Sequence, residues 1–402
     1  MTMFSTEHAT QLLVPGAARI SSGIKMPVRV LHVINSLGLG GAQVCLKYLA
    51  ENASDEVKIL VYPLRAKKID MPIDAAVIKL PFRHYDPRKF FAILRLCREH
   101  QIDIIHAHLH KSIIGALLAT YFRDVRVVIH EHGPIFRSGP QYGLYRFLLR
   151  RLHQRAGRVI AVSQATAQRL TQKAKIDPRR ISIIPNAVDL DKFACRSELR
   201  DHARAQLGAG PDDIVLGFVG RLHYVKGVDV LLEAAALLLE KSPRYLLALI
   251  GAGPQRSALQ TQAQQLGIAA RVRFLGFRSD IPEIIPAFDI GLVPSRQEPF
   301  GMVALEFMRA KIPLVASGVD GLAEIVTHEQ TALVPADNTP RQTADCVERL
   351  THDKELARKL TEAAFQVSER YGVAQYVKTI ENIYAELLSK EMPFCEKKQL
   401  NG

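Results

Sequence analysis

The sequence lacks any uncharged apolar run near the ~20 residues that a membrane-spanning helix requires, which argues against a transmembrane protein. Its five cysteines are scattered over 402 residues and never form a CxxC pair, so neither a disulfide framework nor a zinc site is indicated. The first residues lack the basic, apolar and small-residue order of a secretory signal. We therefore expect a protein of the reducing cytoplasm, with no cofactor and no bound metal.

Charge is distributed unevenly along the chain. The total is +13, with 48% apolar and 23% charged residues, a composition that excludes collagen-like, coiled-coil and largely disordered proteins. Residues 1–195 hold 29 Lys and Arg against 14 Asp and Glu, whereas residues 196–402 hold 24 against 26. A basic first half suits a nucleic acid, an anionic membrane surface or a phosphorylated substrate.

Short apolar runs alternate with amphipathic stretches from residue 27 onward, which predicts parallel sheets covered by helices. Residues 1–26 have no such pattern and are expected to be a poorly ordered extension. The rhythm breaks after residue 193 and restarts near residue 214. We therefore predict an α/β protein with domains at 27–192 and 193–372, followed by a helix at 373–390 that packs back toward the first domain.

A glycine-flanked basic loop follows the first predicted strand of the second half, in the sequence GRLHYVKG. It places Arg221 and Lys226 between Gly220 and Gly227, where the carboxyl end of a parallel strand presents its ligand. Arginine binds a phosphate bidentately and lysine acts as a point charge, so the loop suits a diphosphate. The alternative is an ordinary solvated basic loop.

Two carboxylates follow in PSRQEPFGMVALEFM, at residues 294–308. Pro299 favours an extended Glu298 before the helix that carries Glu306. The start of that helix offers an anion site made of the backbone N–H groups of Phe300, Gly301 and Met302. The alternative is a capped helix with one surface glutamate.

The first half ends its first predicted strand in NSLGLGGAQ. Gly38, Gly40 and Gly41 crowd a turn before a helix, but the pattern is neither GxGxxG nor a P-loop. Such a turn brings backbone N–H groups close to a phosphate. A tight turn that requires positive φ explains the same glycines.

Histidines cluster at two predicted strand ends of the first half. Alternation places His106, His108 and His110 on one face, and no carboxylate or cysteine joins them at a ligand spacing, so a metal site is not expected. His132 ends its strand where the two halves face each other, and it is suited to bond a sugar or a reacting hydroxyl.

Taken together, these motifs resemble the GT4-type (group 1) family of retaining glycosyltransferases. The stretches that carry the resemblance stand in family order over roughly residues 28–390; they include LHVINSLGLGGAQ, HAHL, EHG, FVGRLHYVKGVDVLLEA, LIGAGPQR and PSRQEPFGMVALEFM. One departure is Ala187, where the family usually has the glycine of PNG. The resemblance implies the GT-B fold, in which two facing Rossmann-like α/β domains hold the active site in the cleft between them.

The resemblance also implies roles for individual residues. Arg221 and Lys226 resemble the pair that holds the nucleotide diphosphate, and Glu306 resembles the carboxylate that bonds the ribose. Glu298 and His132 resemble the groups near the donor sugar. The remaining expected binding residues are Gly40, Gly41, His108, Gly220, Phe300, Gly301 and Met302.

The family retains anomeric configuration, and no protein nucleophile is evident, so we expect a front-face displacement. No DxD stretch is expected to hold a metal, and the protein's own cations are expected to replace Mg²⁺ at the leaving diphosphate.

The acceptor is expected to bind the basic first half. In QYGLYRFLLRRLHQR, residues 141–155, an apolar stripe of Tyr145, Leu148, Leu149 and Leu152 is flanked by Arg146, Arg150, Arg151 and Arg155. This pattern predicts a helix lying on an anionic membrane, although a core-facing stripe with solvated arginines gives the same pattern. We expect a saccharide or polyprenyl-linked acceptor, and a role in cell-surface polysaccharide or lipopolysaccharide synthesis at the inner face of the membrane.

Two rival functions share parts of these signals. One is another GT-B enzyme, namely a nucleotide-sugar epimerase or a phosphorylase that uses pyridoxal phosphate, although no lysine motif for the latter is evident. The other is a nucleic-acid-binding protein, which the charge favours but no binding motif supports.

Overall fold

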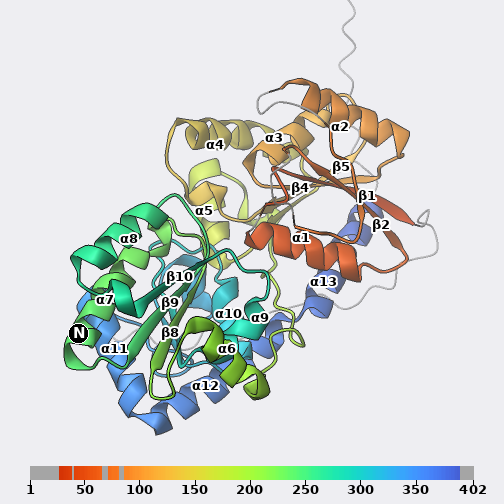
Figure 1. Ribbon diagram of the computed structural model, residues 1–402. Coiled ribbons are helices and arrows are strands. Elements are labelled where there is room, and N and C mark those ends of the chain that lie inside the picture. Colours follow the sequence, from red (N-terminus) through yellow and green to blue (C-terminus); the bar gives the residue numbers. More distant parts are fainter. Residues whose placement is uncertain (1–26, 39, 66–70, 81–85, 390–402) are drawn as a thin grey trace, which may run out of the picture.

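The computed structural model describes residues 27–38, 40–65, 71–80 and 86–389; the expected extension at 1–26 lies outside them. These residues form two α/β domains, each built on a parallel sheet (Figure 1).

The N-terminal domain has a seven-stranded sheet in the order β3-β2-β1-β4-β5-β6-β7. Its strands are β1 (Val28–Ile34), β2 (Val57–Pro63), β3 (Ala76–Val77), β4 (Ile104–His108), β5 (Arg126–Glu131), β6 (Arg158–Ala161) and β7 (Ile181–Ile183). Its helices are α1 (Gly41–Asn52), α2 (Arg88–Glu99), α3 (His110–Ala119), α4 (Pro140–Leu152) and α5 (Gln164–Ala174).

The C-terminal domain has a five-stranded sheet in the order β10-β9-β8-β11-β12. Its strands are β8 (Ile214–Val219), β9 (Tyr245–Ile250), β10 (Val272–Gly276), β11 (Ile290–Val293) and β12 (Leu314–Ala316). Its helices are α6 (Arg200–Leu207), α7 (Val228–Lys241), α8 (Arg256–Gln265), α9 (Ile281–Ile284), α10 (Met302–Arg309), α11 (Pro340–His352) and α12 (Lys354–Ser368).

The strands of both sheets are short, largely apolar runs of sequence. The VRVLHVI of β1 is buried along nearly its whole length, as expected for a strand that has helices on both faces. It pairs in parallel with both β2 and β4, so that Ile34 lies beside Pro63 and His108 at the carboxyl end. This arrangement confirms the predicted α/β class with two facing parallel-sheet domains.

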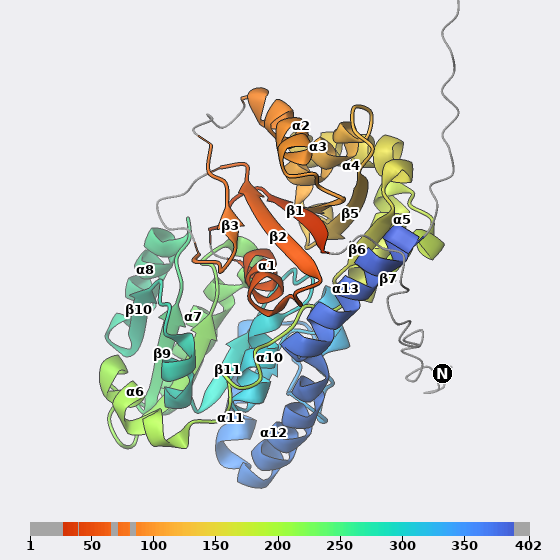
Figure 2. The same ribbon diagram turned by 90° about the vertical axis from the view of Figure 1, so that its right-hand side faces the viewer.

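The last helix, α13 (Val373–Ser389), leaves the C-terminal domain and packs on the N-terminal sheet (Figure 2). Tyr376, Ile380 and Tyr384 join a buried cluster with Val30 of β1 and Val128 of β5. The chain therefore crosses twice between the domains, and its end covers one face of the first sheet.

Direct contacts join the two domains. Glu324 accepts hydrogen bonds from the backbone N–H groups of Gln164 (2.9 Å) and Ala165 (2.8 Å), at the positive end of α5. Arg169 of the same helix bonds Asp320 at 3.0 Å. These contacts hold the carboxyl edges of the two sheets against each other.

The prediction that the stripe with Tyr145 and Leu149 on α4 faces a membrane is wrong. Both side chains are buried in the core, where Tyr145 donates a 2.5 Å hydrogen bond to the buried Glu131. The exposed apolar side chains of α4 are Leu144 and Phe147 instead. Within the described residues, none of the helices combines the length and the apolar character needed to cross a bilayer.

Candidate active site

The loop after β8 is a short 3₁₀ turn that places Lys226 at its end. Gly227 follows with φ +66°, and a Cβ there would lie 2.1 Å from the carbonyl oxygen of Pro294. Only glycine tolerates this approach, so the GR-x₄-KG spacing anchors the basic loop directly on the loop after β11. The backbone N–H of Arg296 donates to the carbonyl of Val225 at 2.8 Å and completes this attachment.

The two loops bring together the predicted charged residues. Lys226 forms an ion pair and hydrogen bond with Glu298, although 72 residues separate them. The hydroxyl of Ser295 also donates to the Glu298 carboxylate, at 3.2 Å. Glu298 is 9% exposed, and these partners satisfy its buried carboxylate. The pair fixes the side chain of Lys226 at the carboxyl edge of the sheet.

Arg221 lies on the same loop and keeps part of its surface in solvent. Partial burial of the guanidinium lowers its pKa, and the nearby Arg137 lowers it further, while Glu298 opposes both effects. Arg137 belongs to the N-terminal domain and was not singled out from the sequence. The positive charges of two arginines from opposite domains therefore lie close enough to repel each other.

The start of α10 faces the N-terminal domain. A Cβ on Gly41 would lie 3.0 Å from the sulfur of Met302, and one on Gly133 would lie 2.6 Å from Pro299. The glycine turn before α1, the residue after His132 and the N-terminus of α10 therefore adjoin one another. The φ of Gly133, +130°, favours glycine at this contact.

The other members of the predicted set lie around this centre. Gly40 caps α1, Gly220 follows β8, Gly301 caps α10, and His108 ends β4. The ring of Phe300 is buried, with its centre 5.8 Å from that of Tyr371, so only its backbone can serve a ligand.

Glu306 lies one and a half turns into α10, apart from the Lys226 pair. Burial raises its pKa to about 7, and Lys192 of the interdomain linker partly counters that shift. A carboxyl group with this pKa accepts hydrogen bonds when ionised and donates one when neutral. It is suited to bind the hydroxyls of a ligand.

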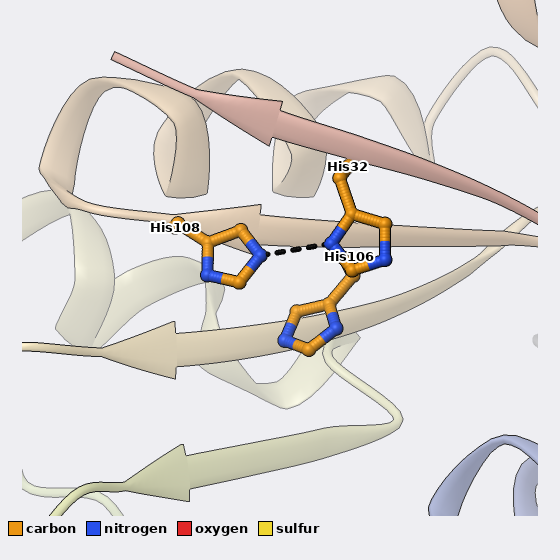
Figure 3. A group of neighbouring side chains, drawn as sticks. All are labelled: His32, His106 and His108. Carbon is orange, nitrogen blue, oxygen red and sulfur yellow. Dashed lines mark hydrogen bonds between the residues drawn. The ribbon is translucent and has the colours of Figure 1, made fainter. Parts of the chain in front are cut away.

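The histidine cluster is more compact than the sequence suggested. His110 does not share the strand face with His106 and His108, because α3 begins at that residue. His32, His106 and His108 instead lie close together on β1 and β4 (Figure 3), and His130 and His132 extend the group. His132 is connected to the group by a hydrogen bond to His108, at 3.1 Å.

Glu131 of the EHG stretch was not singled out from the sequence. It accepts hydrogen bonds from the backbone N–H of Gly133 (2.8 Å) and Ile135 (3.2 Å) and so shapes the turn after β5. Its place directly before His132 was the only available signal.

Comparison with known proteins shows the family of this chain. Residues 39–192 match the family described as Glycosyltransferase Family 4, and residues 200–367 match Glycosyl transferases group 1. A D-inositol 3-phosphate glycosyltransferase of Corynebacterium aurimucosum is 30% identical over 324 residues, covering 76% of this chain and 77% of the relative. The chain belongs to the GT4-type group 1 glycosyltransferase family and is a glycosyltransferase.

Other relatives agree with this assignment. The Escherichia coli UDP-Gal:alpha-D-GlcNAc-diphosphoundecaprenol alpha-1,3-galactosyltransferase is 26% identical over 310 residues, covering 75% of this chain and 80% of the relative. The structure of Anabaena Alr3699/HepE in complex with UDP-glucose superposes with a TM-score of 0.78 at 25% identity, covering 89% of this chain and 99% of that one. WaaG, a glycosyltransferase involved in lipopolysaccharide biosynthesis, superposes with a TM-score of 0.71 at 20% identity, covering 90% of this chain and all of the other. These likenesses confirm the GT-B fold.

Proposed function

We propose that this protein transfers a sugar from a nucleotide-diphosphate sugar to a phosphate-bearing, lipid-linked saccharide acceptor, with retention of anomeric configuration. The observation that carries the proposal is the basic loop of Arg221 and Lys226, anchored beside Glu298. UDP and UDP-glucose are bound by the similar Anabaena protein, which supports a uridine nucleotide donor.

Loss of the nucleotide diphosphate is the difficult step, because negative charge accumulates on the departing phosphate. Arg221, Lys226 and the amino end of α10 are proposed to stabilise that charge as it develops. Arg137 adds a third cation from the opposite domain. When the diphosphate takes Lys226, Glu298 is released to accept hydrogen bonds from the sugar hydroxyls.

The chemistry is proposed to need no divalent metal. The adjacent aspartates Asp212 and Asp213 lie before β8, at the opposite end of the strand, and Asp213 is already paired with Arg271 at 2.5 Å. The one DxD of the sequence, Asp189–Leu190–Asp191, lies in the linker between the domains, where Asp189 accepts a hydrogen bond from the backbone N–H of Lys192 at 2.9 Å. The cations of the protein are proposed to carry the role that Mg²⁺ has in other transferases. A front-face reaction, in which the leaving phosphate takes the acceptor proton, accounts for retention without a protein nucleophile.

The acceptor side is proposed to lie on the inner surface of an anionic membrane. Helices α2, α3 and α4 lie along one outer side of the N-terminal domain (Figure 1). Exposed aromatic and aliphatic side chains occur on α2 and α4 and in the turn after α3; they are Phe91, Tyr121, Phe122, Leu144 and Phe147. Exposed arginines accompany them, and the guanidinium of Arg155 lies 3.4 Å above the ring of Tyr121. Aromatic and basic groups together suit the headgroup region.

The relatives point to two kinds of acceptor. The Escherichia coli enzyme acts on a diphosphoundecaprenol-linked sugar, and the corynebacterial one is an inositol 3-phosphate glycosyltransferase. Both acceptors carry phosphate, which suits the basic N-terminal half. The exposed apolar surface favours the lipid-linked acceptor, and with it a role in polysaccharide or lipopolysaccharide synthesis.

The test is a donor and acceptor panel with the purified full chain. UDP-, GDP- and ADP-sugars are each screened for protection against thermal unfolding, and the stabilising donor is then offered polyprenyl-diphosphate sugars and inositol phosphate. We expect a UDP-sugar to stabilise and an α-linked product to form on the lipid-linked acceptor. An inverted anomer, or epimerisation of the donor without transfer, would overturn the proposal.

A further inference from the structure

Five histidines and one tyrosine, all buried except the half-buried His132, form a continuous hydrogen-bonded chain behind the interdomain site. The links are His130 to His106 (3.2 Å), His106 to Tyr384 (2.6 Å), Tyr384 to His32 (3.3 Å), His32 to His108 (3.0 Å) and His108 to His132 (3.1 Å). Figure 3 shows the centre of this chain, where His32 of β1 meets His108 of β4. Tyr384, from α13, joins its two halves.

The chain is electrically neutral. Burial lowers the pKa of His32 and His132 to about 3 and that of the other three rings well below their usual value. Burial also raises the pKa of Tyr384. Each ring therefore carries one N–H donor and one bare nitrogen acceptor, and the tyrosine carries one O–H.

Neutrality makes the chain directional. Each inner ring donates one link and accepts the other, so the direction of the links on each side of Tyr384 is set by the bond to its hydroxyl. The ends of the chain are Nε2 of His130 and Nδ1 of His132, and both ring nitrogens are buried without a hydrogen-bond partner. If His32 donates to Tyr384, Nδ1 of His132 is left bare, whereas if Tyr384 donates to His32, that nitrogen is left protonated.

The two bonds of Tyr384 distinguish these directions. An O–H donor makes shorter hydrogen bonds than a ring N–H donor. The hydroxyl lies 2.6 Å from Nδ1 of His106 and 3.3 Å from Nε2 of His32. It therefore donates to His106 and accepts from His32. His32 must then accept from His108, and His108 from Nε2–H of His132.

We propose that Tyr384 is a positioning residue which, through His32 and His108, fixes His132 as its Nε2–H tautomer and leaves Nδ1 as a hydrogen-bond acceptor for a substrate hydroxyl. The tautomer is a property of this chain alone, whereas the substrate part rests on the proposed glycosyl transfer. His132 is half-buried and directly precedes Gly133, which lies against Pro299 of the other domain, so this ring belongs to the turn that adjoins the proposed site.

A metal ion is the competing explanation for so many histidines. Ring nitrogens of His32, His106 and His108, and of His108, His130 and His132, lie within 4.8 Å of one another. In the chain, however, both nitrogens of His32, His106 and His108 already belong to links. A bound ion would break at least one link and require a different set of tautomers.

The tautomers are measured directly by ¹⁵N NMR of the imidazole rings in the full-length protein. The His132 signals are assigned from their loss in His132→Gln, and the metal content of the same sample is determined. We expect an Nε2–H, Nδ1-bare ring at His132 from pH 6 to pH 8, with no bound metal. An Nδ1–H ring at His132, a charged ring, or a stoichiometric metal would overturn the proposal.

The variant Tyr384→Phe removes the hydroxyl and leaves the ring. His32 then loses its acceptor, so we expect His132 to become a mixture of tautomers, and kcat to fall about tenfold, as for outer-shell partners of active groups. Tyr376→Phe is the matched control, because that buried hydroxyl lies on the same helix outside the chain. An unchanged His132 tautomer in a folded Tyr384→Phe protein would overturn the role of Tyr384. Retention of that tautomer pattern in a protein inactive with every donor would instead contradict the proposed function alone.

Discussion

Lys226 and Glu298 form an ion pair across 72 residues of sequence, between the loops that follow β8 and β11. The pair is internal to one domain and mostly shielded from water, since the two side chains are 21% and 12% exposed. Its geometry keeps a cation at the carboxyl edge of the sheet in the absence of a ligand. A diphosphate that binds there would replace the Glu298 carboxylate as the anion paired with Lys226.

Lys226→Ala is expected to reduce transfer by about 100-fold or more, because the lost cation both binds the diphosphate and stabilises the negative charge that develops on it. Its effect on the melting temperature should be small, since the loop is also held by Gly227 and by backbone hydrogen bonds. Transfer kinetics and thermal unfolding are measured side by side. Lys241→Ala, an exposed lysine paired with Glu348, is the control, and full activity in Lys226→Ala would refute the site.

Activity is expected to survive an excess of EDTA. The reason is that Arg221, Lys226 and Arg137 supply the positive charge that a divalent ion supplies elsewhere. The measurement is the initial rate with and without chelator, followed by the addition of Mg²⁺ or Mn²⁺. Complete loss of activity that either ion restores would contradict metal-independent transfer.

Glu306 should make stability depend on pH. Its pKa rises from 4.5 unfolded to about 7 folded through burial, so its ionisation disfavours folding. This cost is absent below pH 4.5, grows as the pH rises and is fully present above pH 7. The free energy of unfolding of Glu306→Gln, relative to that of the wild type, should therefore increase by about 2 kcal/mol from pH 5 to pH 8. Denaturant unfolding of both proteins at pH 5 and pH 8 measures this increase. If the difference between the two proteins is the same at both pH values, the pKa of Glu306 is not raised.

Loss of donor binding in Glu306→Gln tests the proposed contact of Glu306 with the ribose.

Glu324 is expected to help hold the domains together. Its carboxylate bonds two backbone N–H groups at the start of α5, where the helix dipole strengthens the contact by about 1 kcal/mol. Small-angle X-ray scattering of Glu324→Ala should show a larger radius of gyration than the wild type. Glu355→Ala removes an exposed carboxylate paired only along its own helix and should leave the radius unchanged. If the radius of gyration is unchanged in both variants, Glu324 does not hold the domains together.

Binding to anionic vesicles should depend on α4 and its neighbours. Changing Arg150, Arg151 and Arg155 to Gln should weaken salt-sensitive binding by about 3 kcal/mol, since each basic residue near the surface contributes about 1 kcal/mol. Vesicle co-sedimentation with anionic and neutral lipids measures this. Arg341 and Arg358, exposed in the C-terminal domain, provide the control substitutions. Equal binding to neutral vesicles would contradict the membrane surface.

The sequence predicted the features that depend on short-range pattern. Buried parallel strands are continuous apolar runs, and the loops after β8 and β11 follow directly from where those runs end. The orientation of α4 was not predictable in this way, because the helix has two apolar stripes. One contains Tyr145 and Leu149, and the other contains Leu144 and Phe147. Tertiary packing decides which stripe is buried: Tyr145 and Leu149 join the core of the N-terminal domain, and the Tyr145 hydroxyl bonds Glu131.

The histidine chain depends on contacts too distant for any local pattern. Tyr384 is 278 residues from His106 and belongs to a helix that returns from the other domain. The HAH spacing correctly places His106 and His108 on one face of β4, but nothing in it indicates Tyr384 or His32 as partners. Arg137 was missed for the same reason, since its significance comes from the approach of Arg221 across the domain boundary.

Isothermal titration of a UDP-sugar measures the proposed diphosphate site without requiring the acceptor. The wild type and Lys241→Ala should bind with equal affinity, and Lys226→Ala should bind about 30-fold more weakly, which corresponds to about 2 kcal/mol for one charge-assisted contact. Equal affinity in all three proteins would contradict the account and place the donor elsewhere.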